Sequence, residues 1–458
     1  MLNRRTFIKL ASICLLPLSQ FSQAITPQYR AITLKLRTET QDWFANYAPI
    51  QLWASDLKQL DLQQFETVQI EVQNQLPEAT SLHWHGMRVE NRMDGVSGMT
   101  QAPIAAGASF NYQITARDAG TYWAHAHHQT YEQLARGLYL PLIVWEAEKY
   151  VVDQDLLMVI DDWLINADRQ LDIASLANFT EWAHGGRKGN VITVNRQRDN
   201  IYHCKLGQRI RLRLLNAANS RIMTLAFPNL KVWILAKDGQ PLPTPLKSDK
   251  PLTLGPAERY DLIVEIPQSI GNFPIYEVSA KQKLVVSNIV VTANDRLLQH
   301  DSEPLALPEN RLPKIDKNNI VHRKKLLMEG GAMGNLQQAR YQGELLSVNE
   351  LVKKQQIWSF NGVANLADQP LLTAKSGEMV EIEIINQTRW PHAMHLHGHH
   401  FKADSAFYPK NIWHDTLLIE AGGTTKIMFR AGERGKWLLH CHMIEHQASG
   451  MATWIQVS

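Results

Sequence analysis

Residues 68–86, VQIEVQNQLPEATSLHWHG, align without a gap to residues 380–398, VEIEIINQTRWPHAMHLHG. In this alignment Asn74 coincides with Asn386, and both stretches end in the sequence His-x-His-Gly. A sequence that recurs in this way indicates a repeated structural unit. We therefore expect two similar domains, one near each end of the chain.

A second block repeats in the same order, because residues 120–127, GTYWAHAH, match residues 435–442, GKWLLHCH. In the middle of the chain, residues 271–278 correspond to this block and contain no histidine. Both repeating blocks thus occur near the two ends of the chain, and the middle of the chain has a degenerate version of the second.

The first block also has a degenerate copy in the middle of the chain, which begins at Ile210. Asn216 keeps the asparagine position, and an ungapped alignment puts Leu225 and Phe227 at the histidine positions. We expect this third copy to have the same fold and to have lost its metal chemistry.

Each full copy reads as a strand with one buried face, since Val68, Ile70 and Val72 alternate with polar residues. At about 150 residues per domain, a chain of this length is expected to form three domains. Many short strands and little helical periodicity predict an all-β protein with three Greek-key β-sandwich domains in series. We place these domains at residues 25–146, 147–300 and 318–458.

A proline-rich segment, Glu303–Asp316, separates the last two predicted domains. Pro304, Pro308 and Pro313 favour an extended linker there, and an ordinary surface loop is the alternative.

The composition is that of an ordinary folded protein and excludes several classes. Of the 458 residues, 45% are hydrophobic, and 47 basic against 44 acidic side chains give a formal charge of only +3. Such a small and scattered charge argues against a nucleic-acid-binding surface. Three cysteines are too few for a disulfide framework, and Cys204 is expected to be a buried apolar residue.

The first residues resemble an export signal. Asn3-Arg4-Arg5-Thr6-Phe7-Ile8-Lys9 is a twin-arginine pattern, followed by an apolar stretch at residues 11–18 and small residues before a cleavage site at Ala24. We interpret residues 1–24 as a twin-arginine signal peptide, with a chance pair of arginines as the alternative. No later stretch approaches the roughly 20 apolar residues of a membrane span. The mature protein is therefore expected in the periplasm, exported in the folded state by the twin-arginine machinery.

Histidines carry the strongest functional signal, because 14 of the 18 fall in residues 83–128 and 392–446. In a strand, residues i and i+2 point to the same face, so a His-x-His pair presents two imidazoles side by side to a metal. The chain has four such pairs: His83/His85, His125/His127, His395/His397 and His440/His442. Eight imidazoles exceed the needs of one ion, which indicates a multinuclear cluster shared by the first and third domains.

Cys441 lies between His440 and His442 and must face the other way, so it belongs to a second site. His392 stands an odd number of residues before His395, and His446 and Met451 follow Cys441 at loop-like spacing. Two imidazoles, a thiolate and a thioether are the ligands of a blue-copper electron-transfer centre. Zinc is the alternative, although a structural zinc site usually has more cysteines.

These motifs together resemble the four copper signatures of the multicopper oxidase family, which includes laccases and bacterial copper-efflux oxidases. The signatures are His83-Trp84-His85-Gly86, His125-Ala126-His127, His392-x-x-His395-x-His397, and His440-Cys441-His442-x-x-x-His446-x-x-x-x-Met451. The resemblance covers nearly the whole mature chain and implies three cupredoxin-like domains and four copper ions. Thr80 and Ala126 stand where the third domain has His392 and Cys441, which explains why only one blue site is expected.

The resemblance also implies the distribution of the ligands. It gives the type 1 copper to His392, Cys441 and His446 with Met451 axial, and the type 2 copper to His83 and His395. The type 3 pair takes His85, His125, His127, His397, His440 and His442. In this scheme a donor gives electrons singly to the type 1 site, Cys441 relays them to His440 and His442, and four electrons reduce O2 to two waters.

An acidic residue past the first His-x-His supplies protons in the family, and Asp94 occupies that place. A simple turn aspartate before Gly95 is the alternative. Many bacterial relatives have a second acid directly after the last type 1 histidine, and this chain has Gln447 there. Asp94 is therefore expected to carry more of the proton supply.

Other departures from the family concern the first domain and the donor. The first domain has Asn46-Tyr47-Ala48-Pro49-Ile50 in place of the usual Gly-Pro turn, and no methionine-rich segment lies near the type 1 motifs. Cuprous oxidase activity is thus less secure than oxidation of phenols or aromatic amines. The extra histidines are expected to lie on the surface or to contact the ligands from outside: His128, His399, His400 and His414.

Three functions fit the sequence to different degrees. The first is an oxidase that takes electrons from a phenol, an aromatic amine or a low-valent metal ion, working as a monomer. The second is a copper nitrite reductase, which the complete cluster and the third domain disfavour. The third is a non-catalytic periplasmic copper-binding or scaffold protein of the same fold, although no ligand is missing here.

Overall fold

The computed structural model describes residues 29–458, apart from residues 281, 295–297, 299, 301, 406, 407 and 410. The predicted signal peptide, residues 1–24, lies outside the described residues. β-Strands are the main regular structure of the described chain, and its helices are short.

The strands form three consecutive groups along the chain. The first group is β1 (Arg30–Gln41), β2 (Ile50–Ser55), β3 (Leu60–Gln63), β4 (Thr67–Asn74), β5 (Leu82–His85), β6 (Ser109–Thr115), β7 (Gly120–Ala126) and β8 (Tyr139–Trp145). The second is β9 (Gln154–Trp163), β10 (Val191–Val194), β11 (Ile201–Lys205), β12 (Arg209–Asn216), β13 (Met223–Ala226), β14 (Lys231–Lys237), β15 (Gln240–Ser248), β16 (Leu252–Leu254), β17 (Arg259–Glu265), β18 (Gly271–Glu277) and β19 (Leu284–Thr292). The third is β20 (Ile320–Gly330), β21 (Gln338–Tyr341), β22 (Glu344–Ser347), β23 (Trp358–Phe360), β24 (Leu372–Ala374), β25 (Met379–Asn386), β26 (His392–Leu396), β27 (Phe401–Ala403), β28 (Trp413–His414), β29 (Thr416–Ile419), β30 (Thr424–Arg430), β31 (Gly435–Cys441) and β32 (Ala452–Val457).

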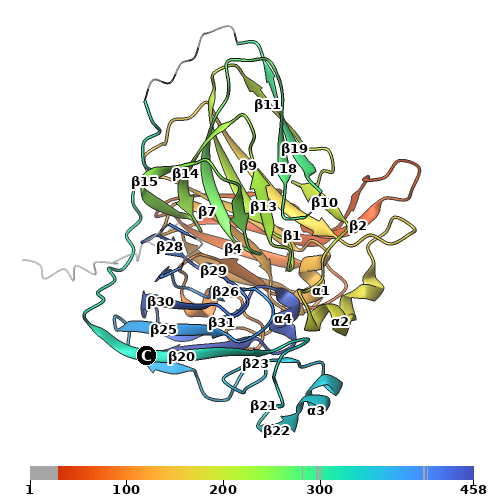
Figure 1. Ribbon diagram of the computed structural model, residues 1–458, viewed down its shortest axis with the longest axis vertical. Helices are drawn as coiled ribbons and strands as arrows, with labels where there is room; N and C mark the ends of the chain where they lie inside the picture. Colours follow the sequence, from red (N-terminus) through yellow and green to blue (C-terminus); the bar gives the residue numbers. More distant parts are fainter. Residues whose placement is uncertain are drawn as a thin grey trace, which may run out of the picture.

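Short helices lie between these strands. The helices are α1 (Thr130–Ala135), α2 (Phe179–Ala183), α3 (Val348–Lys353) and α4 (Ile444–Ala448), with 3-10 turns at Asn91–Met93 and Ile173–Ala177. Helices α1, α2 and α4, one from each group, lie side by side at one edge of the molecule (Figure 1). This edge is where the three groups meet.

Each group folds into two main sheets, and the strand order shows the predicted crossovers. The first group gives sheets β2-β1-β4-β6 and β3-β8-β7-β5, and the second gives β10-β9-β12-β17-β14-β15 and β11-β19-β18-β13-β16. The third gives β23-β20-β25-β30-β27-β28 and β24-β32-β31-β26-β29, with the small β21-β22 hairpin beside them. The parallel pairs β1/β4, β9/β12 and β20/β25 recur at equivalent places. The prediction of an all-β protein with Greek-key β-sandwich domains is confirmed.

The repeated asparagine has the same structural task in all three groups. The side-chain oxygens of Asn74, Asn216 and Asn386 accept a hydrogen bond from the backbone N–H two residues later, at 3.0, 3.1 and 2.9 Å. Each amide nitrogen donates to two backbone carbonyls, one in the following loop and one from a distant segment. A buried amide satisfied in this way fixes the loop that follows the strand.

The middle copy requires a correction of one residue. His83 pairs with His125 across β5 and β7, whereas Ala226 pairs with Tyr276 at the equivalent place in β13 and β18. The histidine position is therefore Ala226 rather than Leu225, and the next one falls at Pro228 rather than Phe227. The loop after Asn216 is one residue longer, since its amide reaches the carbonyl five residues on, against four after Asn74.

The segment Glu303–Asp316 runs in extended form between the second and third groups, as Figure 1 shows along one side of the molecule. It packs against the first and second groups. Leu307 is buried with Trp233, and the Asn310 side chain accepts a hydrogen bond from the Ala119 N–H and donates one to the Ala119 carbonyl. The prediction of a linker is confirmed, and its contacts tie it to the first and second groups.

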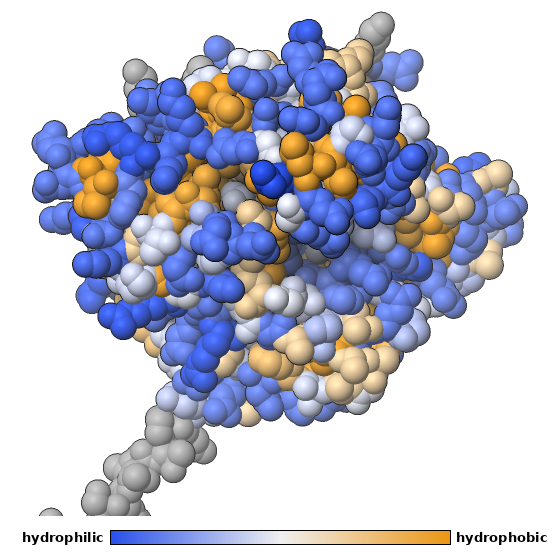
Figure 2. All heavy atoms as spheres, turned by 90° about the horizontal axis from the view of Figure 1, so that it is seen from below, coloured by the Kyte–Doolittle hydropathy of each residue, from blue (hydrophilic) through white to orange (hydrophobic). Residues whose placement is uncertain are grey.

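Two further observations concern the surface. No helix in the described part of the chain is long and apolar enough to cross a membrane. The face seen in Figure 2 is mostly hydrophilic, and its apolar residues lie in separate patches.

Candidate metal centres

The four His-x-His pairs come from two pairs of neighbouring strands. His83 of β5 lies opposite His125 of β7, and His395 of β26 lies opposite His440 of β31. Because side chains alternate along a strand, the partner two residues away lies on the same face. The first and third groups thus each present four imidazoles to a shared interior.

All eight of these histidines are buried, with His127 the most exposed at 6%. Their Nε2 atoms meet across the two groups: His83 and His395 lie 3.4 Å apart, and His125 and His442 lie 3.3 Å apart. Nε2 of His397 lies 3.0 Å from Nε2 of His440. The structure therefore brings together every residue that the sequence assigns to the cluster.

The opposite ring nitrogen of several of these histidines is held by a fixed partner. Nδ1 of His83 donates to the backbone carbonyl of Asp94, and Nδ1 of His395 donates to that of Asp415, both at 2.8 Å. Nδ1 of His125 and of His440 donate to the carbonyl of the next residue. These bonds fix the rings with Nε2 toward the interior, where a metal ion can accept its lone pair.

His85 has the opposite orientation. Its Nε2 lies 3.2 Å from Oδ1 of Asp415 and 3.1 Å from Oγ1 of Thr416, and its Nδ1 has no hydrogen-bond partner among the described residues. Nδ1 is thus the nitrogen that His85 offers to a metal.

Asp94 contacts two cluster histidines. Its Oδ2 accepts a hydrogen bond from Nδ1 of His397 at 2.9 Å, and its Oδ1 lies 3.2 Å from Nδ1 of His83. The next residue, Gly95, has a φ of +82°, and a Cβ there would lie 1.7 Å from the Leu82 carbonyl oxygen. Asp94 therefore lies in a turn, as the alternative interpretation has it, and also contacts two histidines of the cluster.

Burial favours the neutral form of several cluster imidazoles. It lowers the pKa of His85, His125 and His395 well below the usual value, and the neighbouring histidines add to this effect. The pKa of His440 falls to about 3 from the same burial. Neutral imidazoles are the form that binds metals, so these histidines need not lose a proton when a cation binds.

The second site unites His392, Cys441 and His446, as the sequence predicts. Nδ1 of His392 lies 3.0 Å from Nδ1 of His446, and Sγ of Cys441 lies 3.6 and 3.8 Å from these two atoms. Met451 is fully buried beside them, with its carbonyl accepting a hydrogen bond from the Cys441 backbone at 3.1 Å.

The outer edges of these two imidazoles are also fixed. Nε2 of His392 is 2.8 Å from Oγ1 of Thr388, and Nε2 of His446 donates to the backbone carbonyl of His184 at 2.8 Å. Both Nδ1 atoms are thereby directed at the Cys441 sulfur. Burial raises the pKa of Cys441 to about 12, so a metal ion is needed to hold it as a thiolate.

This donor set fits copper. One soft thiolate with two imidazoles and a nearby thioether matches a blue-copper site, and the all-imidazole cluster suits copper as well. Among the described residues, five groups could hold an ion, and they draw on these ligands and Asp415.

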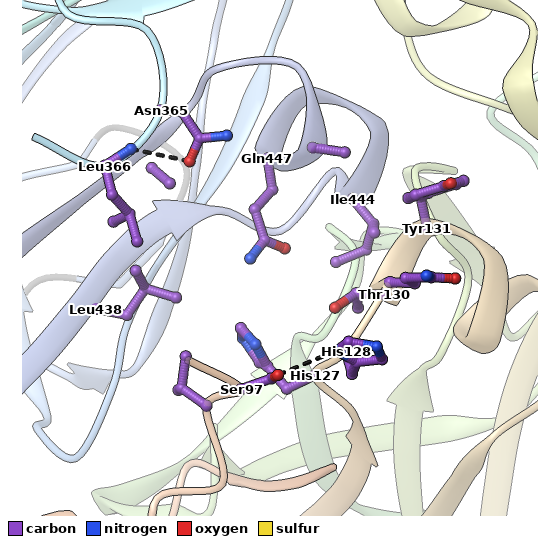
Figure 3. A pocket seen from close by; sticks show the side chains of 14 residues that line it. Ser97, His127, His128, Thr130, Tyr131, Asn365, Leu366, Leu438, Ile444 and Gln447 are labelled. Carbon is purple, nitrogen blue, oxygen red and sulfur yellow. Dashed lines mark hydrogen bonds between the residues drawn. The ribbon is translucent and has the colours of Figure 1, made fainter. Parts of the chain in front are cut away.

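A cavity of about 380 Å³ opens beside the cluster. His127 lines it from the first group, and Gln447 points into it from α4, opposite Ser97 and His128 (Figure 3). Nδ1 of His128 lies 3.0 Å from Oγ of Ser97. The cavity gives small molecules a path to the His127 side of the cluster.

The extra histidines lie outside both sites. His399, His400 and His414 are buried rather than on the surface, and they contact His397, Asp415 and Asp238 respectively. His128 is half-buried at the cavity. Cys204 is buried, as expected, and burial raises its pKa to about 11.

Several residues that contact or adjoin the candidate ligands were not predicted from the sequence: Arg259, Asp415, Thr416, Thr388 and Glu445. Asp415 follows the extra histidine His414 directly, which was the only local signal for it. Thr416, Thr388 and Glu445 lie within four residues of Asp415, His392 and His446, whereas Arg259 lies in the middle group and reaches the site only through the fold.

Comparison with known proteins places this arrangement in a family. Family models described as multicopper oxidase match residues 57–149, 155–294 and 340–458, one for each group of strands. The chain belongs to the multicopper oxidase family. A solved protein from a marine microbial metagenome is 31% identical, with a TM-score of 0.74 over 93% of this chain and all of that one.

Two further relatives agree. A multi-copper oxidase from Pseudomonas thermotolerans has a TM-score of 0.81 and 25% identity over 94% of this chain and all of its own. Multicopper oxidase MmcO of Mycobacterium tuberculosis is 27% identical over 85% of this chain and 79% of its own length. This multicopper oxidase is an oxidoreductase that uses copper and O2.

Proposed function

We propose that this multicopper oxidase binds four copper ions and couples four one-electron oxidations of a small donor to the reduction of O2 to water. The type 1 ion would be held by His392, Cys441, His446 and Met451, and the type 2 ion by His83 and His395. The type 3 pair would be held by His85, His125, His127, His397, His440 and His442. The observation that carries this assignment is the convergence of ring nitrogens that other hydrogen bonds leave free.

When bound, the four copper ions would together supply the four electrons that O2 needs, one from the type 1 site and three from the cluster. The protein supplies the connection between the two. Cys441 is joined by single peptide bonds to His440 and His442, whose Nε2 atoms lie in the cluster. The donor site and the O2 site therefore share one continuous covalent path.

The cavity at His127 supports its use for entry of O2 and exit of water. Asp94 is buried against His397 and His83, so it can hold a proton at its carboxyl oxygens close to where O2 is reduced. Gln447 lines the same cavity and its side-chain oxygen has no hydrogen-bond partner among the described residues. Proton supply from Asp94 is thus part of the proposal.

Electron-rich phenols or aromatic amines are the proposed donors. Nε2 of His446 meets the carbonyl of His184, and the His184 ring packs edge-on against Trp390 with centroids 5.4 Å apart. Both rings are partly exposed, so an aromatic donor can approach within a short distance of His446. Oxidation of Fe(II), Mn(II) or Cu(I) is the second candidate, since the relatives include a copper resistance protein A from Pseudomonas syringae.

The cellular setting belongs to the same proposal. The twin-arginine pattern supports export of a folded monomer to the periplasm after removal of residues 1–24. The strand groups support three domains close to residues 25–146, 147–300 and 318–458.

Copper counting combined with an oxygen-uptake assay on the purified protein tests the function. About four coppers per chain and donor-dependent uptake of O2 are expected. Copper binding without O2 uptake would favour the non-catalytic copper-binding protein instead. Reduction of nitrite at a rate that exceeds O2 uptake would favour the reductase.

A further inference from the structure

The middle group of strands holds none of the histidines of the cluster, yet one of its side chains reaches the cluster. Arg259, at the start of β17, is fully buried. Its NH1 donates to Oδ1 of Asp415 at 2.7 Å, and its NH2 donates to Oδ2 at 2.5 Å. This two-pronged contact is the geometry in which a guanidinium fixes a carboxylate most firmly.

Arg259 also contacts the first group of strands and a backbone carbonyl of its own group. Its Nε donates to the backbone carbonyl of Thr121 in β7 at 3.2 Å, and NH1 donates to the carbonyl of Ala257 at 3.1 Å. A Cβ on Gly86 would lie 2.4 Å from its NH2 and 2.5 Å from Oδ2 of Asp415. The glycine of the His-Trp-His-Gly motif therefore leaves the space in which this ion pair sits.

Asp415 transmits this contact to the cluster. Its Oδ1 lies 3.2 Å from Nε2 of His85 and accepts a hydrogen bond from Oγ1 of Thr416 at 2.9 Å. The carboxylate can only accept, so Nε2 of His85 carries the proton and Nδ1 keeps its lone pair. The orientation of Asp415 thus decides which nitrogen His85 offers to a metal.

We propose that Arg259 is a positioning residue through which the middle domain sets the ring orientation of His85, and with it the copper affinity of the cluster. The inference rests on the proposed copper sites. An unpaired Asp415 carboxylate in this interior would be strongly unfavourable and would rotate or take up a proton. In either case Nε2 of His85 would lose its carboxylate acceptor and keep only Oγ1 of Thr416, at 3.1 Å.

A matched control exists in the same sheet. Arg213 is as deeply buried as Arg259, binds Asp155 with two prongs at 2.6 and 2.8 Å, and reaches Oγ1 of Thr121 at 3.0 Å. It contacts no histidine in these interactions. Arg213→Lys therefore reproduces the loss of a buried arginine that bridges two domains, without a change at the cluster.

The test compares Arg259→Lys and Arg213→Lys in the full copper-loaded protein. The readouts are copper per chain after dialysis against a chelator, the blue absorption, the EPR spectrum and the thermal midpoint. We expect both variants to lose thermal stability and to keep the blue absorption. Only Arg259→Lys should bind cluster copper about 10–100-fold more weakly, as is typical when a group behind a metal ligand is removed. Equal copper retention in the two variants overturns the inference.

A neutral double variant covers the case in which Arg259→Lys does not fold. Arg259→Met with Asp415→Leu removes both buried charges together, which is much less costly than removing one. Leucine offers no acceptor to Nε2 of His85, so cluster copper should still be weakened. Full copper affinity in the double variant contradicts the role of the pair. Failure of the parent protein to bind copper would instead refute the proposed function.

Discussion

Oδ2 of Asp94 lies 2.9 Å from Nδ1 of His397, in an interior where both side chains are fully buried. This contact joins a turn of the first domain to a histidine of the third. It makes Asp94 part of the wall of the cluster and places its carboxyl group beside the site proposed for O2 reduction.

Replacement of this carboxyl group should slow the O2 step alone. In Asp94→Asn we expect unchanged blue absorption and anaerobic reduction by donor, because His392, Cys441 and His446 are untouched. Reoxidation by O2 should slow by about 10²-fold, the scale of a lost proton donor. Stopped-flow reoxidation measures this, with Asp118→Asn as the control, since Asp118 is a buried carboxylate of the same domain that pairs with Arg88. An unchanged rate of reoxidation in Asp94→Asn would contradict proton supply by Asp94 and leave it a structural role alone.

Gln447 offers the complementary change. A carboxyl group in Gln447→Glu would project into the cavity that His127 lines, and it could deliver protons there (Figure 3). We expect faster reoxidation by O2, or a shift of its pH dependence, with no change in donor oxidation under anaerobic conditions. Gln447→Leu is the matched control without a proton. Identical reoxidation in the glutamate and leucine variants would argue against proton delivery through this cavity.

Glu445 should make stability depend on pH. Burial raises its pKa to about 7, and its Oε1 accepts a hydrogen bond from Asn219 at 2.9 Å. The unfolded chain loses this proton near its ordinary pKa, so between that value and about pH 7 the folded state binds more protons. Glu445 therefore costs stability as pH rises through this window, and the full cost is present above it.

Glu445→Gln removes that cost. We expect the variant to be more stable than the parent at pH 8 by about 1–3 kcal/mol, with the difference shrinking toward pH 5. Thermal or urea unfolding of the two proteins at several pH values measures this. A stability difference that stays constant across the range is the contrary result.

A donor panel tests the substrate class. We expect broad, modest activity on electron-rich phenols and aromatic amines, because His184 and Trp390 flank the outer edge of His446. Trp390→Ala should raise KM for phenols more than it lowers kcat. Saturable turnover of one metal ion with none of the phenols would overturn this expectation.

The sequence was sufficient for the fold class and for the side chains that meet at the two candidate metal centres, for a physical reason. A strand alternates strictly, so His-x-His and the intervening Cys441 fix which side chains share a face. The duplicated asparagines showed which segments correspond, and Asn74 and Asn386 make matching hydrogen bonds. The local spacing of these residues was therefore enough to predict which side chains meet.

Contacts between distant segments could not be predicted in this way. Arg259, Asp415 and Gly86 come from three domains, and no periodicity links their positions. The offset in the middle copy was hidden as well, because an ungapped alignment has no room for the extra loop residue before Ala226. Both the contact of Arg259 with Asp415 and the offset in the middle copy depend on packing rather than on local sequence pattern.

The most direct test of the account is the visible and EPR spectrum of Cys441→Ser. The parent should be blue when copper-loaded, and so should Cys204→Ser, because Cys204 lies in β11 of the middle domain and belongs to none of the groups that could hold an ion. Cys441→Ser should lose the blue colour and donor oxidation while the type 2 signal stays. An intense visible band that persists in Cys441→Ser would contradict the assignment of the type 1 site.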